Sequence, residues 1–238
     1  MEKTEELSVF FPAYNEEENI KKTVTEAIAV LTKVAKKWEI IVIDDGSTDR
    51  TGERVKELIK KESRLRLVTH TPNRGYGAAL KSGLYHSRYN LITFMDADGQ
   101  FDFGEITGFL ETQRKTGADL VIGYYQQRQV PLYRLWGSKW LWQPAIYCLF
   151  GLKVRDIDCG FKLLKKEVIE KIPKLEAERG PFISSELLIK AKQTGFKIRE
   201  IGVSHFPRKS GKATGASLKV ILSGFLDLVR LKRKLQRI

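Results

Sequence analysis

The sequence predicts an α/β domain with a mostly parallel central sheet and helices on both faces. Short apolar runs alternate with longer segments of helical periodicity, which is typical of βαβ units. The run Ile-Ile-Val-Ile at 40–43 is apolar throughout, which indicates a strand buried on both faces. Polar clusters follow several of these runs, and ligands of such sheets bind beyond the carboxyl ends of the strands. At 238 residues, 42% of them hydrophobic, the chain can bury one substantial core.

The elements follow from these patterns in chain order. Strands are expected at 7–11, 39–44, 65–69, 91–95, 119–123 and 198–203, with another after 156–162. Helices are expected at 16–36, after a cap at Asp49 or Thr51, and at 78–87, 102–115, 166–172, 184–194 and from 218 onward. The first strand is expected to end at Pro12. Acidic residues at 16–18 favour a helix start because they complement the helix dipole. The stretch 124–150, aromatic and basic, follows the pattern less closely.

Charge and cysteine content narrow the setting. The formal net charge is +13, and it is concentrated in residues 205–238, where many Lys and Arg accompany one acidic residue, Asp227. Cys148 and Cys159 match no zinc spacing, which favours reduced packing thiols in a cytoplasmic protein. The acidic start of the chain does not resemble a secretory signal, and no apolar run reaches the roughly 20 residues of a spanning helix.

The segment Asp96-Ala-Asp-Gly-Gln100 is the strongest functional signal, because it places two carboxylates and an amide at alternating positions after an apolar strand. Side chains at i, i+2 and i+4 of an extended segment project to one side. Such oxygen ligands suit Mg²⁺ or Mn²⁺, commonly with substrate phosphates completing the shell. The alternative is a strand end followed by an ordinary acidic turn.

Further motifs follow other strand ends in a fixed order. Pro-Ala-Tyr-Asn-Glu at 12–16 and Asp-Asp-Gly-Ser at 44–47 precede the 96–100 segment, and together they resemble the signature series of the family 2 glycosyltransferases with the GT-A fold. Asp-Ile-Asp-Cys-Gly-Phe-Lys at 156–162 and Phe-Pro-Arg-Lys-Ser-Gly at 206–211 resemble the branch that loads a sugar onto dolichyl or polyprenyl phosphate. The likeness covers about residues 6–215. We take residues 1–215 as the catalytic domain and residues 216–238 as a basic amphipathic C-terminal helix.

The resemblance implies roles for individual residues. Contacts with the nucleotide sugar are implied for Pro12, Ala13, Tyr14, Glu16, Ile43, Asp45, Asp96, Ala97, Asp98, Arg128, Arg208 and Lys212. Metal and diphosphate contacts are implied for Asp96, Asp98 and Gln100, and catalysis for Asp96, Asp98 and Arg208. For Asp45 a helix-capping role is the alternative.

One position departs from the family pattern. Many relatives carry an arginine two residues after the glycine that ends the fifth strand, where this chain has Tyr125. Arg128 or Arg134 is a candidate replacement, since a guanidinium chelates phosphate with two donors, and either is equally an ordinary solvated charge.

Several other residues of the sequence are candidates for structural or catalytic roles. The glycine-bearing loop at 73–79 is interpreted as a packing turn beside the donor pocket. His70 and His86 are interpreted as surface or packing residues, and His205 as a bystander of the basic loop. Glu186 lies where sugar-acceptor relatives place a catalytic acid, with the start of a helix as the alternative.

The implied reaction is metal-assisted attack by an acceptor on the anomeric carbon of a nucleotide sugar, with inversion; GDP-mannose is the first candidate donor and UDP-glucose the second. A phosphate acceptor is already largely anionic at neutral pH and needs no strong base. The polyprenyl-phosphate acceptor places the enzyme peripherally at the cytosolic membrane face. A soluble glycan, lipid or protein acceptor is the alternative, and a basic nucleic-acid-binding module is a remoter one.

The tail shows how attachment could occur. Apolar residues recur at three- and four-residue intervals, at Ile221, Phe225, Leu228, Leu231, Leu235 and Ile238. Basic side chains fall on the other side, so the segment predicts an amphipathic helix suited to an anionic membrane interface. Packing on its own core or on a partner protein, such as a membrane-anchoring subunit, is the alternative.

Overall fold

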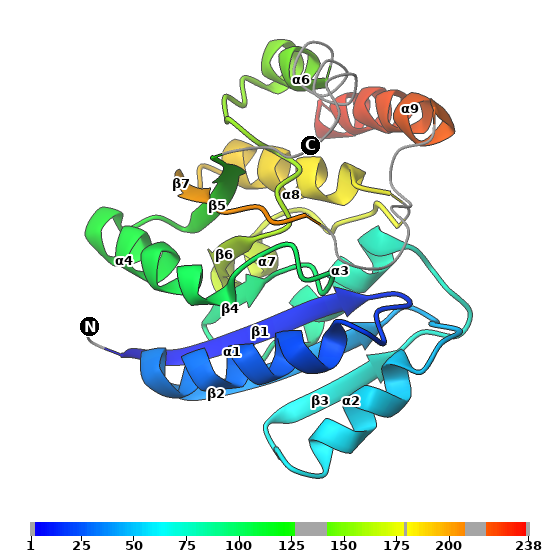
Figure 1. Ribbon diagram of the computed structural model, residues 1–238. Helices are drawn as coiled ribbons and strands as arrows, with labels where there is room; N and C mark the ends of the chain where they lie inside the picture. The colour runs from blue at the N-terminus through cyan, green and yellow to red at the C-terminus, as the bar shows by residue number, and fades with distance from the viewer. Residues whose placement is uncertain (1–2, 127–141, 179, 208–217, 237–238) are drawn as a thin grey trace.

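The structure, a computed structural model, describes residues 3–126, 142–178, 180–207 and 218–236 (Figure 1). One seven-stranded sheet runs through it in the order β3-β2-β1-β4-β6-β5-β7. The strands are β1 (Thr4–Ala13), β2 (Ala35–Asp44), β3 (Leu65–Thr69), β4 (Leu91–Phe94), β5 (Leu120–Tyr125), β6 (Lys162–Lys165) and β7 (Ile198–Val203). β6 pairs antiparallel with β4 and β5, and the other pairings are parallel, so the predicted mostly parallel α/β sheet is confirmed.

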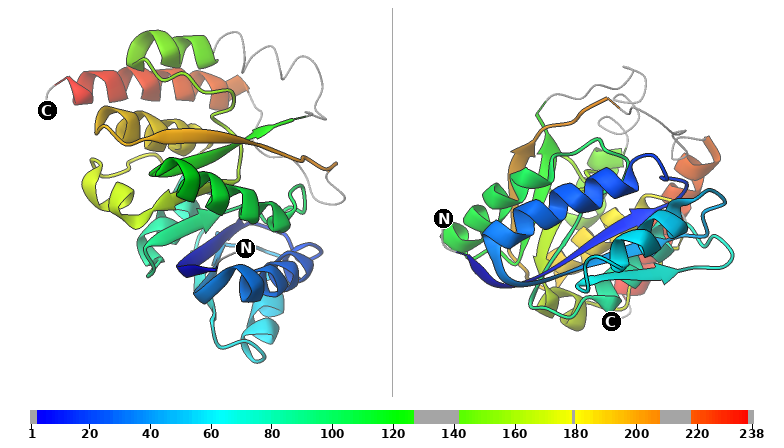
Figure 2. Two further views of the ribbon diagram at one scale, coloured as in Figure 1. Left: turned by 90° about the vertical axis from the view of Figure 1, so that its left-hand side faces the viewer. Right: turned by 60° about the horizontal axis from the view of Figure 1, so that its bottom comes forward.

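Helices cover both faces of the sheet, as Figures 1 and 2 show. They are α1 (Ile20–Val34), α2 (Thr51–Ile59), α3 (Tyr76–His86), the short 3₁₀ helix η1 (Phe103–Glu105), α4 (Ile106–Thr116), α6 (Gln143–Phe150), α7 (Lys166–Lys171), α8 (Phe182–Gln193) and α9 (Leu218–Leu235). Buried side chains of α1, α2 and α4 pack on one face, and those of α3, α6, α7, α8 and α9 belong to the core of the other.

Side chains of β1 point alternately into the two hydrophobic cores, one on each face of the sheet. Val9 and Phe11 belong to the core under α1 and α4, whereas Phe10 belongs to the core under α3 and α8. Each of the three is fully buried, as expected where successive side chains of a central strand point to opposite faces.

The first strand does not end at Pro12 as expected; it continues to Ala13. Backbone groups of Phe10 face β4, since its carbonyl accepts from the Met95 amide, and Pro12 has the same orientation two residues later. Pairing with β4 ends at Phe10, so the missing N–H of Pro12 breaks no ladder hydrogen bond. Pro12 therefore lies within β1 at the edge of the candidate site.

The stretch 124–150 contains a helix that the sequence pattern did not reveal. α6 begins at Gln143 with Pro144 in its first turn and ends at Gly151, which adopts a left-handed conformation (φ 65°). It lies beside α9 at the end of the molecule remote from α2 (Figure 1). Among the described residues, no helix combines the length and apolar character needed to span a bilayer.

Candidate functional site

The polar loops after β1, β2 and β4 meet at one edge of the sheet, as predicted. Strand register places Ala13 beside Asp44, and Phe10 beside Phe94, so the carboxyl ends of the three strands are neighbours. β1 ends toward the right in Figure 1. In a sheet of this kind the crevice beyond these ends is the ligand site.

The loops after β1 and β2 are bonded to one another. The Asn15 amide donates to Ser47 Oγ (2.9 Å), and Asn15 Oδ1 accepts from the Thr48 amide (2.8 Å). Asn15 has a positive φ of 56°, a conformation that Asn tolerates better than most residues. This left-handed turn aims its side chain at the second loop, so the two loops form one unit.

Glu16, predicted to contact the nucleotide, is buried in this unit. Its backbone amide donates to Thr51 Oγ1 (2.8 Å), and its carboxylate accepts from Asn19 Nδ2 (2.7 Å). Neither Asp49 nor Thr51 is the N-cap of α2, which is Arg50 and has no side-chain cap hydrogen bond. Asp49 lies one residue earlier, and its Oδ1 accepts from the Thr51 amide (2.9 Å). Asp49 also accepts from the Glu17 amide (3.1 Å), which adds a second tie between the loops.

Asp45 holds the loop that follows β3. Its Oδ1 bonds His70 Nδ1 (2.6 Å) and accepts from the Arg74 amide (3.1 Å), while Oδ2 accepts from the Gly75 amide (2.7 Å). The helix-cap alternative for Asp45 is wrong, because both of its carboxylate oxygens bond the loop after β3. The Ser47 amide donates to the neighbouring Asp44 instead. Hydrogen bonds with three donors compensate for the burial of this carboxylate.

His70 is a residue that the sequence interpretation underrated. It is buried, and its Nε2 lies 2.8 Å from Ser82 Oγ on α3 while Nδ1 contacts Asp45. The ring therefore connects the end of β2 to α3. Its position one residue beyond β3, at the same sheet edge as Asp45, was the available signal.

Asp96 is positioned by two residues from motifs with other expected roles. The Tyr76 hydroxyl donates to Asp96 Oδ1 (2.9 Å). Burial and then the charge of Asp96 raise the pKa of Tyr76 well above 10.0, so the hydroxyl keeps its proton at neutral pH. On the other side a Cβ at Gly160 would lie 2.2 Å from Asp96 Oδ2, so a larger residue there would displace the carboxylate. The 73–79 segment thus supplies a tyrosine that orients Asp96 as well as a packing turn.

Asp98 and Gln100 form the next part of the turn. Asp98 is 8% exposed, and its Oδ1 accepts from the Gln100 amide (3.1 Å). The Gln100 side chain donates through Nε2 to the backbone carbonyl of Phe206 (3.0 Å). The backbone carbonyl of Gln100 accepts from the Phe206 amide (2.9 Å). These bonds anchor the chain two residues before Arg208. Arg208 itself lies outside the described residues, as do Arg128, Arg134 and Lys212.

The remaining predicted contacts lie at the same edge. Tyr14 is 41% exposed, whereas Ala13 and Ala97 are buried. The Ile43 side chain is fully buried in the core beneath α3, so only its backbone remains for a ligand. Tyr125, which stands where relatives carry arginine, packs against the ring of His205 (centroids 4.5 Å apart) and stacks on Phe101.

The 156–162 turn forms the wall behind Asp96. The Asp158 amide donates to Asp156 Oδ1 (3.1 Å), and Lys162 Nζ donates to the Cys159 carbonyl. Lys162 is fully buried, and desolvation lowers its pKa. Burial likewise raises the pKa of Cys159 to about 12, which fits the expected packing thiol, whereas Cys148 is exposed, contrary to that expectation.

Glu186 is part of a buried structural clamp. Its carboxylate accepts from the amides of Glu176 (2.9 Å) and Ala177 (2.8 Å) and pairs with Lys190 Nζ at 2.6 Å. It lies within α8, four residues past Phe182, so it does not begin the helix. Its donors account for a buried charge that would otherwise be costly.

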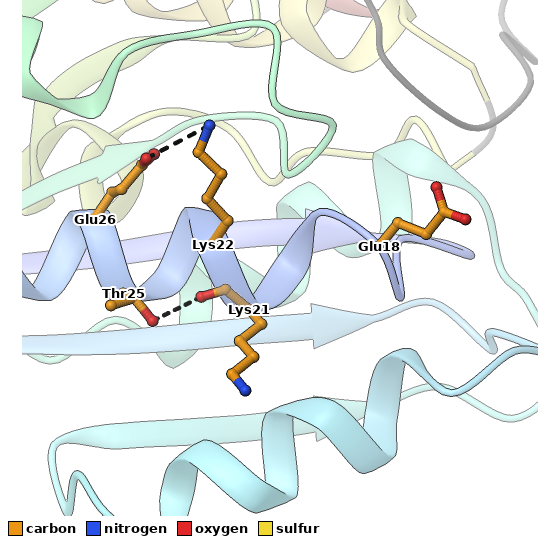
Figure 3. Close-up of a pocket in the computed structure, with 5 residues that line it drawn as sticks. All are labelled: Glu18, Lys21, Lys22, Thr25 and Glu26. Atoms are coloured by element: carbon orange, nitrogen blue, oxygen red, sulfur yellow. Dashed lines mark hydrogen bonds and ion pairs between the residues drawn. The ribbon is translucent and has the colours of Figure 1, made fainter.

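A surface hollow on α1 contains none of the predicted site residues (Figure 3). It is lined by Glu18, Lys21, Lys22, Thr25 and Glu26, with Lys22 Nζ 3.6 Å from Glu26 Oε1. Exposed i,i+4 ion pairs of this kind are ordinary on helix surfaces. We therefore place the candidate site at the strand ends.

The chemistry of the strand-end residues fits a divalent cation. Asp96 and Asp98 are hard oxygen donors two residues apart on one turn, and such pairs hold Mg²⁺ or Mn²⁺ together with substrate phosphates. Within the part of the chain that the structure describes, no group of three or more His, Cys, Asp and Glu is arranged to bind a metal. The predicted set, Asp96, Asp98 and Gln100, has only two carboxylates, and in sites of this kind substrate phosphates commonly supply the other oxygens.

Residues 8–173 match the family described as Glycosyl transferase family 2, and the chain belongs to this family. It is 30% identical to the dodecaprenyl-phosphate galacturonate synthase of Rhizobium johnstonii, over 87% of this chain and 60% of that protein. It is 32% identical to the dolichyl-phosphate beta-glucosyltransferase of Dictyostelium discoideum, over 95% of this chain and 73% of that protein. The resemblance stated from the motifs is thus confirmed, while the relatives are longer than this chain.

The fold also matches solved structures. Glucosyl-3-phosphoglycerate synthase from Mycobacterium tuberculosis, crystallised with Mn²⁺, UDP and phosphoglyceric acid, superposes with a TM-score of 0.71 at 21% identity. The match covers 96% of this chain and 78% of that one. Another crystal of that enzyme holds Mg²⁺ and UDP. The likeness establishes the GT-A fold.

Proposed function

We propose that the protein transfers a hexose from a nucleotide-diphosphate sugar to a polyprenyl phosphate, with Mg²⁺ or Mn²⁺ held by Asp96 and Asp98. This proposal is supported by two observations taken together: the chain has two carboxylates at a strand end, and its relatives are named for polyprenyl-phosphate sugar transfer. Peripheral attachment to the cytosolic face of a membrane, directly or through an anchoring subunit, follows from the lipid nature of such an acceptor.

The donor proposal changes in light of the relatives. GDP-mannose was the first candidate from the motifs, but the relatives named above transfer galacturonate and glucose. A fold neighbour was also crystallised with UDP-glucose. UDP-glucose, the second candidate, therefore becomes the preferred donor.

The site residues support a one-step displacement. An oxygen of the acceptor phosphate forms a bond to the anomeric carbon as the bond from that carbon to the nucleoside diphosphate breaks, which inverts the centre. A bound cation would neutralise the charge that develops on the leaving diphosphate. Asp96, oriented by Tyr76 and Gly160, and Asp98 would hold it in place, while the bonded loops after β1, β2 and β3 would hold the nucleoside. The acceptor is already anionic, so no general base is required.

The test is a donor and acceptor matrix with purified protein and Mn²⁺. UDP-glucose and GDP-mannose are each offered with a long-chain polyprenyl phosphate in detergent, with 3-phosphoglycerate and with a soluble oligosaccharide, and products are identified by mass spectrometry. We expect a glucosyl phosphoprenol that disappears with EDTA. Transfer only to a soluble acceptor would contradict the lipid proposal, and salt-sensitive RNA binding without sugar turnover would contradict the enzyme proposal.

A further inference from the structure

The predicted apolar stripe of the tail is occupied by the protein itself along its described part. Leu228 and Leu231 of α9 are buried, at 1% and 6% exposure, in the core that includes α6 and α8. Lys232 Nζ donates to the Leu149 carbonyl (2.5 Å) at the end of α6 and lies 5.3 Å from the Phe150 ring centroid. The own-core alternative therefore describes this stripe, which is not available to a membrane.

α9 nevertheless exposes a second apolar stripe on its outer side. Leu226 is 60% exposed and Val229 is 47% exposed, three residues apart and therefore on one side of the helix. Arg230 and Arg233, both exposed, follow at four-residue spacing from them. We call these four residues the outer stripe.

The neighbouring helix α6 adds an exposed aromatic residue. Tyr147 is 54% exposed on α6. The exposed large hydrophobic side chains of the described residues are six, and α6 and α9 carry three of them. The two helices lie together beyond α8 (Figures 1 and 2), so apolar exposure is concentrated at this end of the molecule.

We propose that the outer stripe of α9, with Tyr147 of α6, contacts the surface of an anionic lipid bilayer. The inference rests on the proposed function, because a polyprenyl-phosphate acceptor brings the enzyme to such a surface. It assigns the contact to the face opposite the one that the sequence pattern suggested.

The positive charge of the outer stripe favours an anionic lipid surface as its binding partner. Leu226 and Val229 lie beside Arg230 and Arg233 on the helix, and the half-buried Asp227 is already paired with Arg230 at 3.2 Å. Apolar side chains flanked by arginines suit the boundary between acyl chains and anionic headgroups, because long basic side chains extend toward the phosphates. Basic residues near such a surface are attracted by its negative potential.

The outer stripe is also connected to the candidate site through packed segments. Lys234 of α9 pairs with Glu176, and the Ala78 amide at the start of α3 donates to the Glu178 carbonyl (2.9 Å). Tyr76, which orients Asp96, opens the same helix. A bilayer in contact with the outer stripe would therefore be linked through α9 and α3 to the turn after β4 that carries Asp96 and Asp98, which we call the cation turn.

The experiment measures sedimentation of the full chain with vesicles of phosphatidylcholine, with and without phosphatidylglycerol. We expect binding that requires the anionic lipid. The Leu226→Glu/Val229→Glu variant should bind at least about tenfold more weakly, because it removes apolar contact and adds repulsion. Both side chains are exposed, so the circular dichroism spectrum and the melting temperature should match the wild type.

A charge-matched control separates a local stripe from net charge. Lys56→Gln/Lys60→Gln changes the charge by the same amount on α2 and at its C-cap, at the opposite end of the molecule, and should bind vesicles like the wild type. Equal losses in both variants, or unchanged binding in the Leu226→Glu/Val229→Glu variant, would overturn the proposal. Self-association that is abolished by this variant, with no vesicle binding by the wild type, would also overturn it.

A second readout distinguishes failure of this inference from failure of the proposed function. With a short, water-soluble prenyl phosphate as acceptor, the outer-stripe variant should turn over UDP-glucose like the wild type, while transfer to polyprenyl phosphate in vesicles should fall at least about tenfold. If the wild type catalyses neither reaction, the proposed function alone is contradicted, since vesicle binding is measured separately. Equal vesicle turnover by wild type and variant contradicts the outer-stripe proposal alone.

Discussion

The loops after β1, β2 and β3 and the turn after β4 are held in different ways. In the first group, polar side chains bond neighbouring loops, as Asn15 does with Ser47 and Asp45 with His70. In the second, Asp96 is oriented by Tyr76 from α3 and by close contact with Gly160. The loops after β1, β2 and β3 thus form a pre-assembled frame, while the turn after β4 carries two carboxylates two residues apart, whose like charges a bound cation would offset.

Two aspartates of the family motifs also differ in what their side chains do in the folded protein. Asp45 and Asp98 are both buried acidic residues at strand ends, and both belong to family motifs. Asp45 uses both of its oxygens to hold the 70–75 loop, which assigns it an architectural function whatever it contacts in a bound nucleotide. Substitutions in each region can show whether the frame and the cation turn affect activity and stability independently of one another.

The largest effect is expected from Asp98→Ala. Losing a carboxylate that holds the cation should lower sugar transfer at least about a thousandfold, because metal assistance contributes several kcal/mol to transition-state stabilisation. The measurement is the rate of product formation from UDP-glucose. Asp102→Ala is the matched control, since Asp102 is an exposed carboxylate nearby that accepts from the Gly104 amide (2.7 Å). A comparable loss in the control, or none in Asp98→Ala, would contradict the separation.

Gly160→Ala should lower activity by about tenfold to a hundredfold, because displacing a positioned group by an ångström has effects of that order. Its Cβ would lie 2.2 Å from Asp96 Oδ2 and would push the carboxylate aside. Gly117→Ala is the control: φ is 64° there and nothing lies within 4 Å, so it should cost stability of about 1 kcal/mol without affecting transfer. Activity and melting temperature are compared; full activity in Gly160→Ala would show that this wall does not position Asp96.

His70→Ala tests the donor frame. It removes one partner of a buried carboxylate, which should lower the free energy of unfolding by about 1–3 kcal/mol and weaken UDP binding. His86→Ala, an exposed histidine on α3, should leave both quantities unchanged. Urea unfolding and calorimetric titration with UDP provide the measurements. Normal stability and UDP affinity in His70→Ala would mean that the Asp45 cluster does not hold the frame.

The smallest effect concerns the thiol behind the cation turn. Burial raises the pKa of Cys159 from 9.0 to about 12, so the folded state keeps this proton while the unfolded state loses it. The free energy of unfolding should therefore fall as pH rises above about 9, and Cys159→Ala should reduce that slope. At pH about 8 a thiol reagent should label the exposed Cys148 alone. Rapid labelling of two thiols in the folded protein would show that the wall is open.

Much of the fold was predictable because hydrophobic periodicity reports secondary structure directly. The alternation of strands and helices and the meeting of three polar loops follow from it. The continuation of β1 through Pro12 was not predictable, because it depends on where pairing with β4 stops. α6 was missed because the pattern of 124–150 is aromatic and basic, and its boundaries are set by Pro144 and Gly151 in their folded context.

The candidate site was predictable where it rests on sequence motifs and unpredictable where it rests on contacts between distant segments. Asp96 and Asp98 belong to one short motif, whereas Tyr76 and His70 gain their roles from the packing of α3. α9 makes the same point. Its sequence carries an inner and an outer apolar stripe, and only the positions of α6 and α8 decide which one is covered.

The central claim is that Asp96 and Asp98 hold a divalent cation against the donor diphosphate. Titration of Mn²⁺ monitored by electron paramagnetic resonance, with UDP present, tests it most directly in the wild type and in Asp96→Asn/Asp98→Asn. We expect UDP-dependent Mn²⁺ binding by the wild type that is lost in the double variant while the fold is retained. Equal Mn²⁺ binding by both proteins beyond that of UDP alone would contradict it.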